Sequence, residues 1–253
     1  HKADIKDLEQ IESYFKNVDV VFHLAAEPRL QLSVENPVDV HKINVTGTLN
    51  ILEAANRMDV DEVIFSSTCA VYGDQELPIS EDVDENPKSP YGLHKLMGER
   101  YCDLYSRLYD LDTVILRYFN VFGPRKLAEG GYPMVIPKFL RQKQEDKPLT
   151  IVGDGKQTRD YIYVDDVVRA NMRAWQAKGV SGEVFNVASG IQVSVNEIAD
   201  IIGGPTTGIP ERPGEMRFIE ADISKAKKEL DWEPQVEFEE GMDRLMEEWG
   251  VEK

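Results

Sequence analysis

Residues 62–68 read EVIFSST, and residues 89–95 read SPYGLHK. The first stretch combines β-branched and aromatic side chains with a hydroxyl-rich end, a pattern typical of a buried strand. The second stretch places a serine before a proline, which favours a helix start, so we expect a helix from Tyr91 to about Tyr109. A buried strand followed by a helix is the repeating unit of a parallel α/β sheet.

The same alternation continues on both sides of this unit. We expect further strands at 19–25, 113–120, 149–152, 183–188 and near 216–220. We expect further helices at 37–56, 135–144 and 164–177, a short helix opened by the capping box Ser194–Glu197, and amphipathic helices at the end of the chain. The pattern therefore predicts an α/β fold built on a doubly wound parallel sheet, with a less regular part after Gly123 and Pro124.

The charge and hydrophobicity of the chain exclude some classes of function. The chain has 253 residues with 29 Lys and Arg against 46 Asp and Glu, a net charge of −17. Such a surface repels polyanions, so we expect no nucleic-acid partner, and an anionic substrate would need a local basic pocket. No apolar run reaches the roughly 20 residues that span a bilayer, so we expect no membrane partner.

The cysteines and histidines indicate neither a metal site nor a disulfide. The two cysteines, Cys69 and Cys102, have no metal-ligand spacing, and we expect reduced thiols in a cytoplasmic protein. The four histidines form no zinc-binding pattern, so we expect no catalytic metal.

Tyr91 and Lys95 carry the strongest chemical hypothesis. Residues at i and i+4 lie on one helix face, about 6 Å apart. A lysine ammonium beside a phenol favours the phenolate, so we expect a lowered Tyr91 pKa and a general base. The spacing alone is more often a packed tyrosine beside a solvated lysine. Thr68, at the carboxyl end of the preceding strand, adds a hydroxyl where sites form in such sheets, although a helix cap is its ordinary interpretation.

Four stretches occur in an order that resembles a known family. They are 65–73 (FSSTCAVYG), 89–95 (SPYGLHK), 116–124 (LRYFNVFGP) and 153–166 (GDGKQTRDYIYVDD). Together they resemble the extended short-chain dehydrogenase/reductase family, and within it the NAD-dependent nucleotide-sugar epimerases and dehydratases, with UDP-glucose (UDP-galactose) 4-epimerases the nearest pattern. The resemblance implies a Rossmann-like NAD-binding domain from 1–123 and 161–203, and a smaller discontinuous substrate domain from 124–160 and 204–253.

The resemblance also implies roles for individual residues. Thr68, Tyr91 and Lys95 would be catalytic. NAD would contact Asp4, Ile5, Leu24, Ala25, Ala26, Asn44, Ser66, Tyr91, Lys95 and Tyr118. The nucleotide sugar would contact Thr68, Asn120, Val135, Thr150, Val152, Arg159, Tyr161, Arg212 and Glu215, with the two arginines on the diphosphate. Singly, each of these has an equally ordinary interpretation as a salt bridge or as packing.

Two departures from the family pattern shape the expected activity. The family opens with a G-x-x-G-x-x-G turn whose following helix holds the NAD pyrophosphate, and this sequence contains no such motif. Asp4 and Ile5 normally follow two βα units, so we expect that about 60 residues are missing and that this 253-residue chain binds NAD weakly or not at all.

The second departure concerns the reaction. Cys69 and Ala70 follow Thr68 where dehydratases and decarboxylases of the family carry acidic residues, which favours simple epimerisation at C4. A dehydratase, a uronate decarboxylase or epimerase, or an inactive relative stays open, as do N-acetylated hexosamines and uronic acids as sugars. Relatives pair through two long helices, so we expect a homodimer through 37–56 and 91–109.

Overall fold

The main sheet contains four parallel strands. The computed structural model describes residues 1–125, 134–211 and 217–252. The sheet has the order β1-β2-β3-β7, formed by β1 (Val20–His23), β2 (Glu62–Thr68), β3 (Asp112–Tyr118) and β7 (Val184–Val187). All neighbouring pairs are parallel, which confirms the predicted α/β class. β1 lies at one edge of this sheet.

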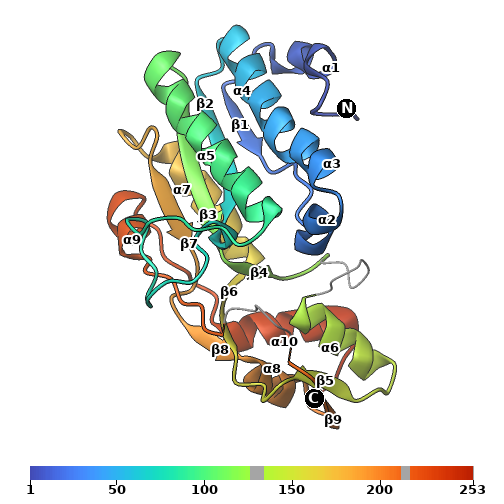
Figure 1. The fold of residues 1–253 in the computed structure, drawn as a ribbon. Helices are drawn as coiled ribbons and strands as arrows, with labels where there is room; N and C mark the ends of the chain where they lie inside the picture. Colours follow the sequence, from blue (N-terminus) through green and yellow to red (C-terminus); the bar gives the residue numbers. More distant parts are fainter. Residues whose placement is uncertain (126–133, 212–216, 253) are drawn as a thin grey trace.

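Helices cover both faces of the main sheet (Figure 1). On one face lie α1 (Leu8–Glu12), α4 (Gly47–Arg57) and α5 (Pro90–Leu108); on the other lie α7 (Val164–Gln176) and α9 (Ser224–Glu229). Side chains of β2 alternate between the two cores, since Val63 and Phe65 pack towards α5 and Ile64 packs towards α7. Two separate apolar layers therefore fix the sheet between its helices.

The helix expected at 37–56 is interrupted. It begins as α3 (Pro37–His41), continues as a π-helical turn over Lys42–Thr46, and becomes α4. The Thr48 hydroxyl donates to the Asn44 carbonyl oxygen at 2.7 Å inside this segment. An additional short helix, α2 (Leu30–Glu35), precedes it and was not expected from the sequence. Short π segments in helices often mark functional sites, and Asn44 lies within this one.

The smaller part of the molecule has its own core. It contains the three-stranded sheet β4 (Asn120–Phe122), β6 (Thr158–Tyr163) and β8 (Gln192–Ser194), and the parallel pair β5 (Leu149–Val152) and β9 (Thr206–Ile209). The helices α6 (Val135–Gln144), α8 (Val195–Ile202) and α10 (Phe238–Trp249) pack around one apolar cluster there (Figure 1). β9 was not expected, and residues 217–220 form no strand where one was expected near 216–220.

The packing suggests different domain boundaries from those expected. α8 shares the apolar cluster of α6 and α10, although 161–203 was expected to belong with the larger sheet. α9 packs on the larger sheet, although 204–253 was expected to belong to the smaller domain. We therefore propose that α8 belongs to the smaller domain and α9 to the larger one, because each shares a core with it.

Candidate active site

The carboxyl end of β2 is the centre of the candidate site. Ser66 and Ser67 are buried there, and Thr68 is half-buried. The Thr68 hydroxyl accepts a hydrogen bond from the Ala70 amide at 3.2 Å, which starts a short 3₁₀ turn and ends the strand. Thr68 therefore does cap this turn. The capping bond uses only an acceptor lone pair of the hydroxyl, so the hydroxyl can still donate its proton in a second hydrogen bond.

α5 presents Tyr91 to this strand end. Ser89 caps the helix by accepting a hydrogen bond from the Gly92 amide at 3.1 Å, and Pro90 occupies the first helical position. The Tyr91 amide donates to the hydroxyl of Ser33 in α2 at 3.0 Å. Two helices therefore hold the backbone of Tyr91 in place before its side chain is considered.

The pKa of Tyr91 differs from the sequence-based prediction. Burial raises it from 10.0 to about 12, and a hydrogen bond from Thr68 acts in the opposite direction. The prediction of a lowered pKa is wrong for this structure, because burial is the largest effect on the phenol and the Lys95 ammonium donates instead to the Ser66 carbonyl oxygen at 2.7 Å. Thr68 is close enough to the phenol to lower its pKa against the effect of burial.

Lys95 is a buried cation. It is 4 % exposed, and burial lowers its pKa to about 8, with Cys102 and Glu99 opposing that shift. Its ammonium also lies 4.9 Å from the centre of the Phe65 ring. The lysine thus loses its proton within a pH range that enzymes experience.

Asn44 organises the loop that follows β1. Its side-chain amide donates to the Glu27 carbonyl oxygen at 2.9 Å, and its side-chain oxygen accepts from the Glu27 amide at 2.7 Å. Leu24 and Ala25 of this loop are exposed, while Ala26 is half-buried. An exposed leucine and two small residues at a strand end offer an apolar surface against which a flat ring can lie.

A second hydroxyl pair lies beside the first. The Tyr118 and Ser66 hydroxyls are 3.1 Å apart, and Tyr118 donates to Asn171 of α7 at 2.9 Å. Asp4 and Ile5 lie elsewhere: Ile5 packs against Gly47, and its carbonyl oxygen accepts from Asn50 of α4 at 2.9 Å. Among the described residues, no hydrogen bond or ion pair joins Asp4 or Ile5 to the strand-end cluster.

The residues expected to contact the substrate lie in different parts of the structure. Asn120 and Arg159 are half-buried on the neighbouring strands β4 and β6, and the Asn120 amide donates to the Asp160 carbonyl oxygen at 3.0 Å. Arg159 donates to the Thr158 carbonyl oxygen at 2.7 Å and has no carboxylate partner within the described part of the chain. Its charge acts on Cys69 and lowers the pKa of that thiol, so the guanidinium lies close to the strand end.

Other expected substrate contacts belong to the smaller domain. Val135, Thr150 and Val152 are half-buried there, and Thr150 is hydrogen-bonded to Gln142. Tyr161 is 4 % exposed and packs against Phe122 and Phe238, so its ring belongs to the apolar core and not to a binding surface. Arg212 and Glu215 lie outside the described residues.

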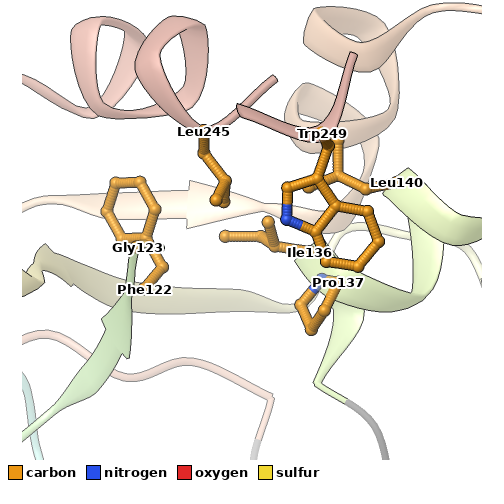
Figure 2. Close-up of a pocket in the computed structure, with 7 residues that line it drawn as sticks. All are labelled: Phe122, Gly123, Ile136, Pro137, Leu140, Leu245 and Trp249. Atoms are coloured by element: carbon orange, nitrogen blue, oxygen red, sulfur yellow. The ribbon is translucent and has the colours of Figure 1, made fainter. Parts of the chain in front are cut away.

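Two cavities, one in each part of the molecule, lie away from this cluster. Figure 2 shows an apolar gap of about 10 Å³ whose wall includes Phe122, Ile136 and Trp249, a volume that only just admits one water molecule. A polar recess of about 380 Å³ is lined by α7 and the segment around α9 and Trp232, on the face of the sheet opposite α5. Neither cavity is lined by Thr68, Tyr91 or Lys95.

Several residues that position the site were missed by the sequence analysis. They are Ser33, Glu27 and Glu99, whose hydrogen-bond partners lie 17 to 58 residues away in the sequence. No spacing rule could have identified them, because their partners come from different elements. In the described residues, no group of three or more histidine, cysteine or acidic side chains could hold a metal ion, and no helix is long and apolar enough to span a membrane.

The fold and the site together define a class of protein. A tyrosine and a lysine four residues apart on one helix, beside a hydroxyl at the carboxyl end of a parallel sheet, are the arrangement expected of a short-chain dehydrogenase/reductase-type enzyme. Residues 1–188 match the NAD dependent epimerase/dehydratase family, and the chain belongs to that family. It is an NAD-dependent enzyme with a Rossmann-like fold, and the epimerase resemblance is confirmed.

Individual relatives cover nearly the whole chain. A putative UDP-glucose 4-epimerase of Methanocaldococcus jannaschii is 43 % identical over 253 residues, covering 96 % of this chain and 81 % of the relative. The UDP-glucose 4-epimerase structure of Thermotoga maritima, with UDP-glucose, has a TM-score of 0.92 at 36 % identity, covering 98 % of this chain and 82 % of that one. A Bacillus cereus UDP-glucuronic acid 4-epimerase structure, with UDP-glucuronic acid and NAD, has a TM-score of 0.88 at 35 % identity, covering 96 % and 80 %.

Proposed function

We propose that this enzyme interconverts nucleoside-diphosphate hexoses that differ in configuration at C4, with UDP-glucose and UDP-galactose as the first candidates. The observation that carries the proposal is the Thr68–Tyr91 hydroxyl pair with Cys69 and Ala70 following Thr68. Epimerisation at C4 moves one proton and one hydride, and the pair supplies the proton path. Relatives named for UDP-glucose support the choice of sugar.

In the proposed reaction, Tyr91 removes the proton of the sugar 4-hydroxyl, with Thr68 donating to the phenolic oxygen. NAD, when bound, accepts the hydride from C4 and returns it. Return of the hydride to the opposite face of C4 would invert the configuration there, and Tyr91 would return the proton to the 4-oxygen. The substrate and product differ only in configuration, so no other reactant is consumed.

Tyr91 needs help to act as a base. Its pKa is raised to about 12 by burial, so a nearby positive charge must stabilise the phenolate at neutral pH. Lys95 is the cation on the same helix face, four residues along α5. We propose that Lys95 stabilises the phenolate in the working enzyme and holds the ribose of NAD together with Asn44, Ser66 and Tyr118.

The same strand end argues against elimination chemistry. A dehydratase needs a carboxylic acid beside the sugar, and Cys69 and Ala70 cannot supply one. The acidic group that influences Cys69 is Asp160, whose carboxylate already accepts hydrogen bonds from Ser189, Gly190 and Ala221. Burial raises the pKa of the Cys69 thiol to about 12, so it is not a thiolate nucleophile either.

Arg159 and Asn120 provide the proposed diphosphate contacts. A half-buried guanidinium that has no carboxylate partner among the described residues is a suitable anion site on a chain whose net charge is −17. Arg212 and Glu215 complete the proposed set of nucleotide contacts, and Val135, Thr150 and Val152 frame the base. In this proposal the smaller domain binds the nucleotide and the diphosphate, and C4 of the sugar faces Tyr91 in the larger domain.

The test is a screen of nucleotide sugars with the full gene product and NAD. UDP-glucose, UDP-N-acetylglucosamine and UDP-glucuronate are each incubated with enzyme, and the C4 epimer is measured by NMR. Formation of UDP-galactose at the highest kcat/KM supports the proposal. A relative of the chain is named UDP-glucuronate 4-epimerase at 34 % identity, so a preference for the uronate would correct the sugar but not the reaction. A 4-keto-6-deoxy product or a pentose would contradict it.

We propose that the enzyme is a homodimer through α3–α4 and α5. Val34, Val38 and Leu93 are exposed apolar side chains on α2, α3 and α5, and these three helices pack against one another. Exposed apolar groups on adjacent helices favour burial against a second copy. Light scattering of the wild type should give twice the mass of one chain, and Val38→Glu should halve it. A monomeric wild type would contradict the assignment.

The cytoplasm is the proposed compartment. Both cysteines, half-buried Cys69 and buried Cys102, are free thiols, as a reducing environment maintains them.

A further inference from the structure

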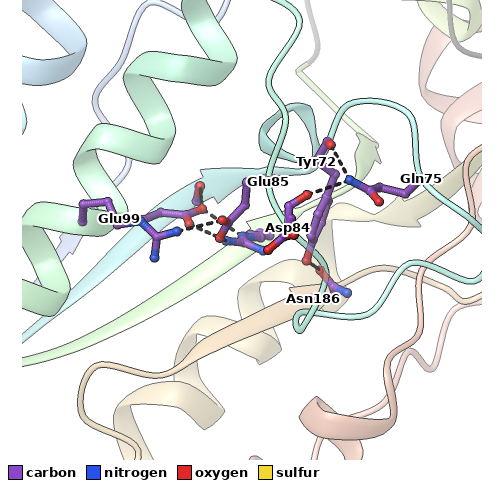
Figure 3. A network of polar contacts seen from close by, with 9 residues as sticks. Tyr72, Gln75, Asp84, Glu85, Glu99 and Asn186 are labelled. Carbon is purple, nitrogen blue, oxygen red and sulfur yellow. Dashed lines mark hydrogen bonds and ion pairs between the residues drawn. The ribbon is translucent and has the colours of Figure 1, made fainter.

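Arg117 is a buried arginine behind the candidate site. It lies on β3, is 1 % exposed, and its guanidinium donates to the Glu99 carboxylate at 3.0 and 2.6 Å and to Glu85 at 2.6 Å. Its charge also lies 4.6 Å from the centre of the Tyr72 ring. Figure 3 shows Glu99, Glu85 and Tyr72 converging in this network. Buried ion pairs contribute little net stability compared with apolar packing, so stability alone does not explain this one.

Glu99 continues the line of Tyr91 and Lys95 along α5. The three residues are four positions apart, so their side chains lie on one helix face. Each meets one of the last three residues of β2: Tyr91 meets Thr68, Lys95 meets the Ser66 carbonyl oxygen, and Glu99 accepts a hydrogen bond from the Ser67 hydroxyl. Three consecutive strand residues are therefore bound by three successive turns of the helix.

The same network orders the segment between β2 and α5. Glu85 bridges Arg117 and Arg100, and Tyr72 donates to Asn186 of β7 at 2.6 Å. Gln75 donates to the Tyr72 and Asp84 carbonyl oxygens at 3.0 and 2.7 Å (Figure 3). This segment leads directly into Ser89, the cap of α5, so its position sets where the first turn of the helix begins.

We propose that Glu99, held by Arg117, is a positioning residue that fixes the register of α5 on β2 and thereby places Tyr91 against Thr68. The inference rests on the proposed epimerase reaction and adds residues to its site. Glu99 touches neither reacting atom. It acts through Ser67, next to Thr68, and through the helix that carries the proposed base. Arg117 neutralises its charge and orients its carboxylate with two donors.

The charges around Lys95 give this role an electrostatic signature. The titratable groups that face Lys95 are Glu99 and Cys102 on α5 and His23 on β1. Burial and Lys95 lower the pKa of His23 to about 3, so His23 stays neutral, and burial raises the pKa of Cys102, so it stays a thiol. Glu99 is the carboxylate among these neighbours, and it raises the pKa of Lys95 against the larger effect of burial. Arg117 weakens that effect by compensating the carboxylate.

The test compares Glu99→Gln with Glu53→Gln in the full gene product. Glu53 is a matched control, because it accepts a hydrogen bond from Tyr105 of α5 at 2.9 Å but lies away from the strand end. Glu99→Gln should lower kcat about 10- to 100-fold with little change in KM, because a small displacement of reacting groups is costly. It should also move the alkaline limb of the kcat profile to lower pH, because Lys95 loses an attractive charge. Glu53→Gln should change neither.

Arg117→Met should move the same limb to higher pH, because Glu99 then acts on Lys95 without compensation. If that variant does not fold, Arg117→Lys, which keeps the charge and loses the two-pronged geometry, should lower kcat without moving the limb. A role limited to stability would lower the melting temperature and leave the limb in place. An active wild type whose Glu99→Gln variant keeps its kcat and its pH profile would overturn the inference.

Hydrogen exchange separates this inference from the proposed function. The amides of residues 91–95 should exchange faster in Glu99→Gln than in the wild type or in Glu53→Gln. Unchanged exchange would overturn the positioning role whatever the activity. If the wild type epimerises no nucleotide sugar, the proposed function fails, and the exchange data still decide whether Glu99 holds α5 on β2.

Discussion

The Lys95 ammonium donates to the carbonyl oxygen of Ser66 across 2.7 Å, two residues before Thr68. This contact holds a cation under the strand end, in a place where only 4 % of the lysine is exposed. The helix position that makes Lys95 a neighbour of Tyr91 thus also makes it a neighbour of the backbone that carries Thr68. The buried lysine is therefore bound to the strand that carries Thr68 and lies one helical turn from Tyr91.

The first prediction concerns how kcat depends on pH above neutrality. Burial lowers the pKa of Lys95 to about 8, so Lys95 is charged below pH 8 and neutral above it. Because the charge stabilises the phenolate, kcat should fall as the pH rises through about 8. Lys95→Met should lower kcat at all pH values and abolish this limb. A limb that persists in Lys95→Met would assign it to another group.

Tyr91→Phe removes the proposed base while leaving the ring. We expect kcat to fall about 10²- to 10⁴-fold, the usual contribution of a general base, with nucleotide-sugar binding nearly unchanged. Tyr109→Phe, at the exposed far end of α5, serves as the control and should have the wild-type rate. Calorimetric binding and single-turnover rates separate the two effects. A Tyr91→Phe enzyme with the wild-type rate would exclude Tyr91 as the base.

Much of the fold follows from local patterns, and the rest depends on contacts between distant elements. The strand 62–68 and the start of α5 were predicted because composition and capping are properties of short stretches. The π-helical turn at Lys42–Thr46 was not predicted. Asn44 in this turn is hydrogen-bonded to Glu27, which is 17 residues away in the sequence. The raised pKa of Tyr91 and the core position of Tyr161 both result from burial, which one-dimensional spacing does not determine.

A third prediction concerns the loop after β1. Asn44→Ala leaves the amide and the carbonyl oxygen of Glu27 without their partner, which should cost about 1–3 kcal/mol of unfolding free energy. Asn50→Ala is the matched control, because Asn50 serves a single carbonyl oxygen, that of Ile5. Urea unfolding followed by circular dichroism gives both values. An equal loss of unfolding free energy in the two variants would show that the two hydrogen bonds of Asn44 stabilise the fold no more than the single one of Asn50.

The opposite end of the sheet provides a test that is independent of function. Burial, with Asp112 and Asp61 nearby, raises the pKa of Glu62 from 4.5 to about 7. A raised carboxyl pKa stabilises the folded state at low pH, and that contribution is lost as the pH rises through about 7.

Glu62→Gln should therefore raise the melting temperature at pH 8 and leave it nearly unchanged at pH 4. The gain should shrink in high salt, which screens the repulsion from the neighbouring carboxylates. A variant that is less stable than the wild type at pH 8 would contradict this account of Glu62.

The central claim is that the enzyme removes a hydride from C4 and returns it to C4. The direct measurement uses UDP-galactose carrying deuterium at C4, incubated with the full gene product and NAD and analysed by NMR and mass spectrometry. The account predicts UDP-glucose that retains the deuterium at C4 without exchange with solvent. Deuterium at C6 of a 4-keto-6-deoxy sugar, or loss of the label to water, would contradict it.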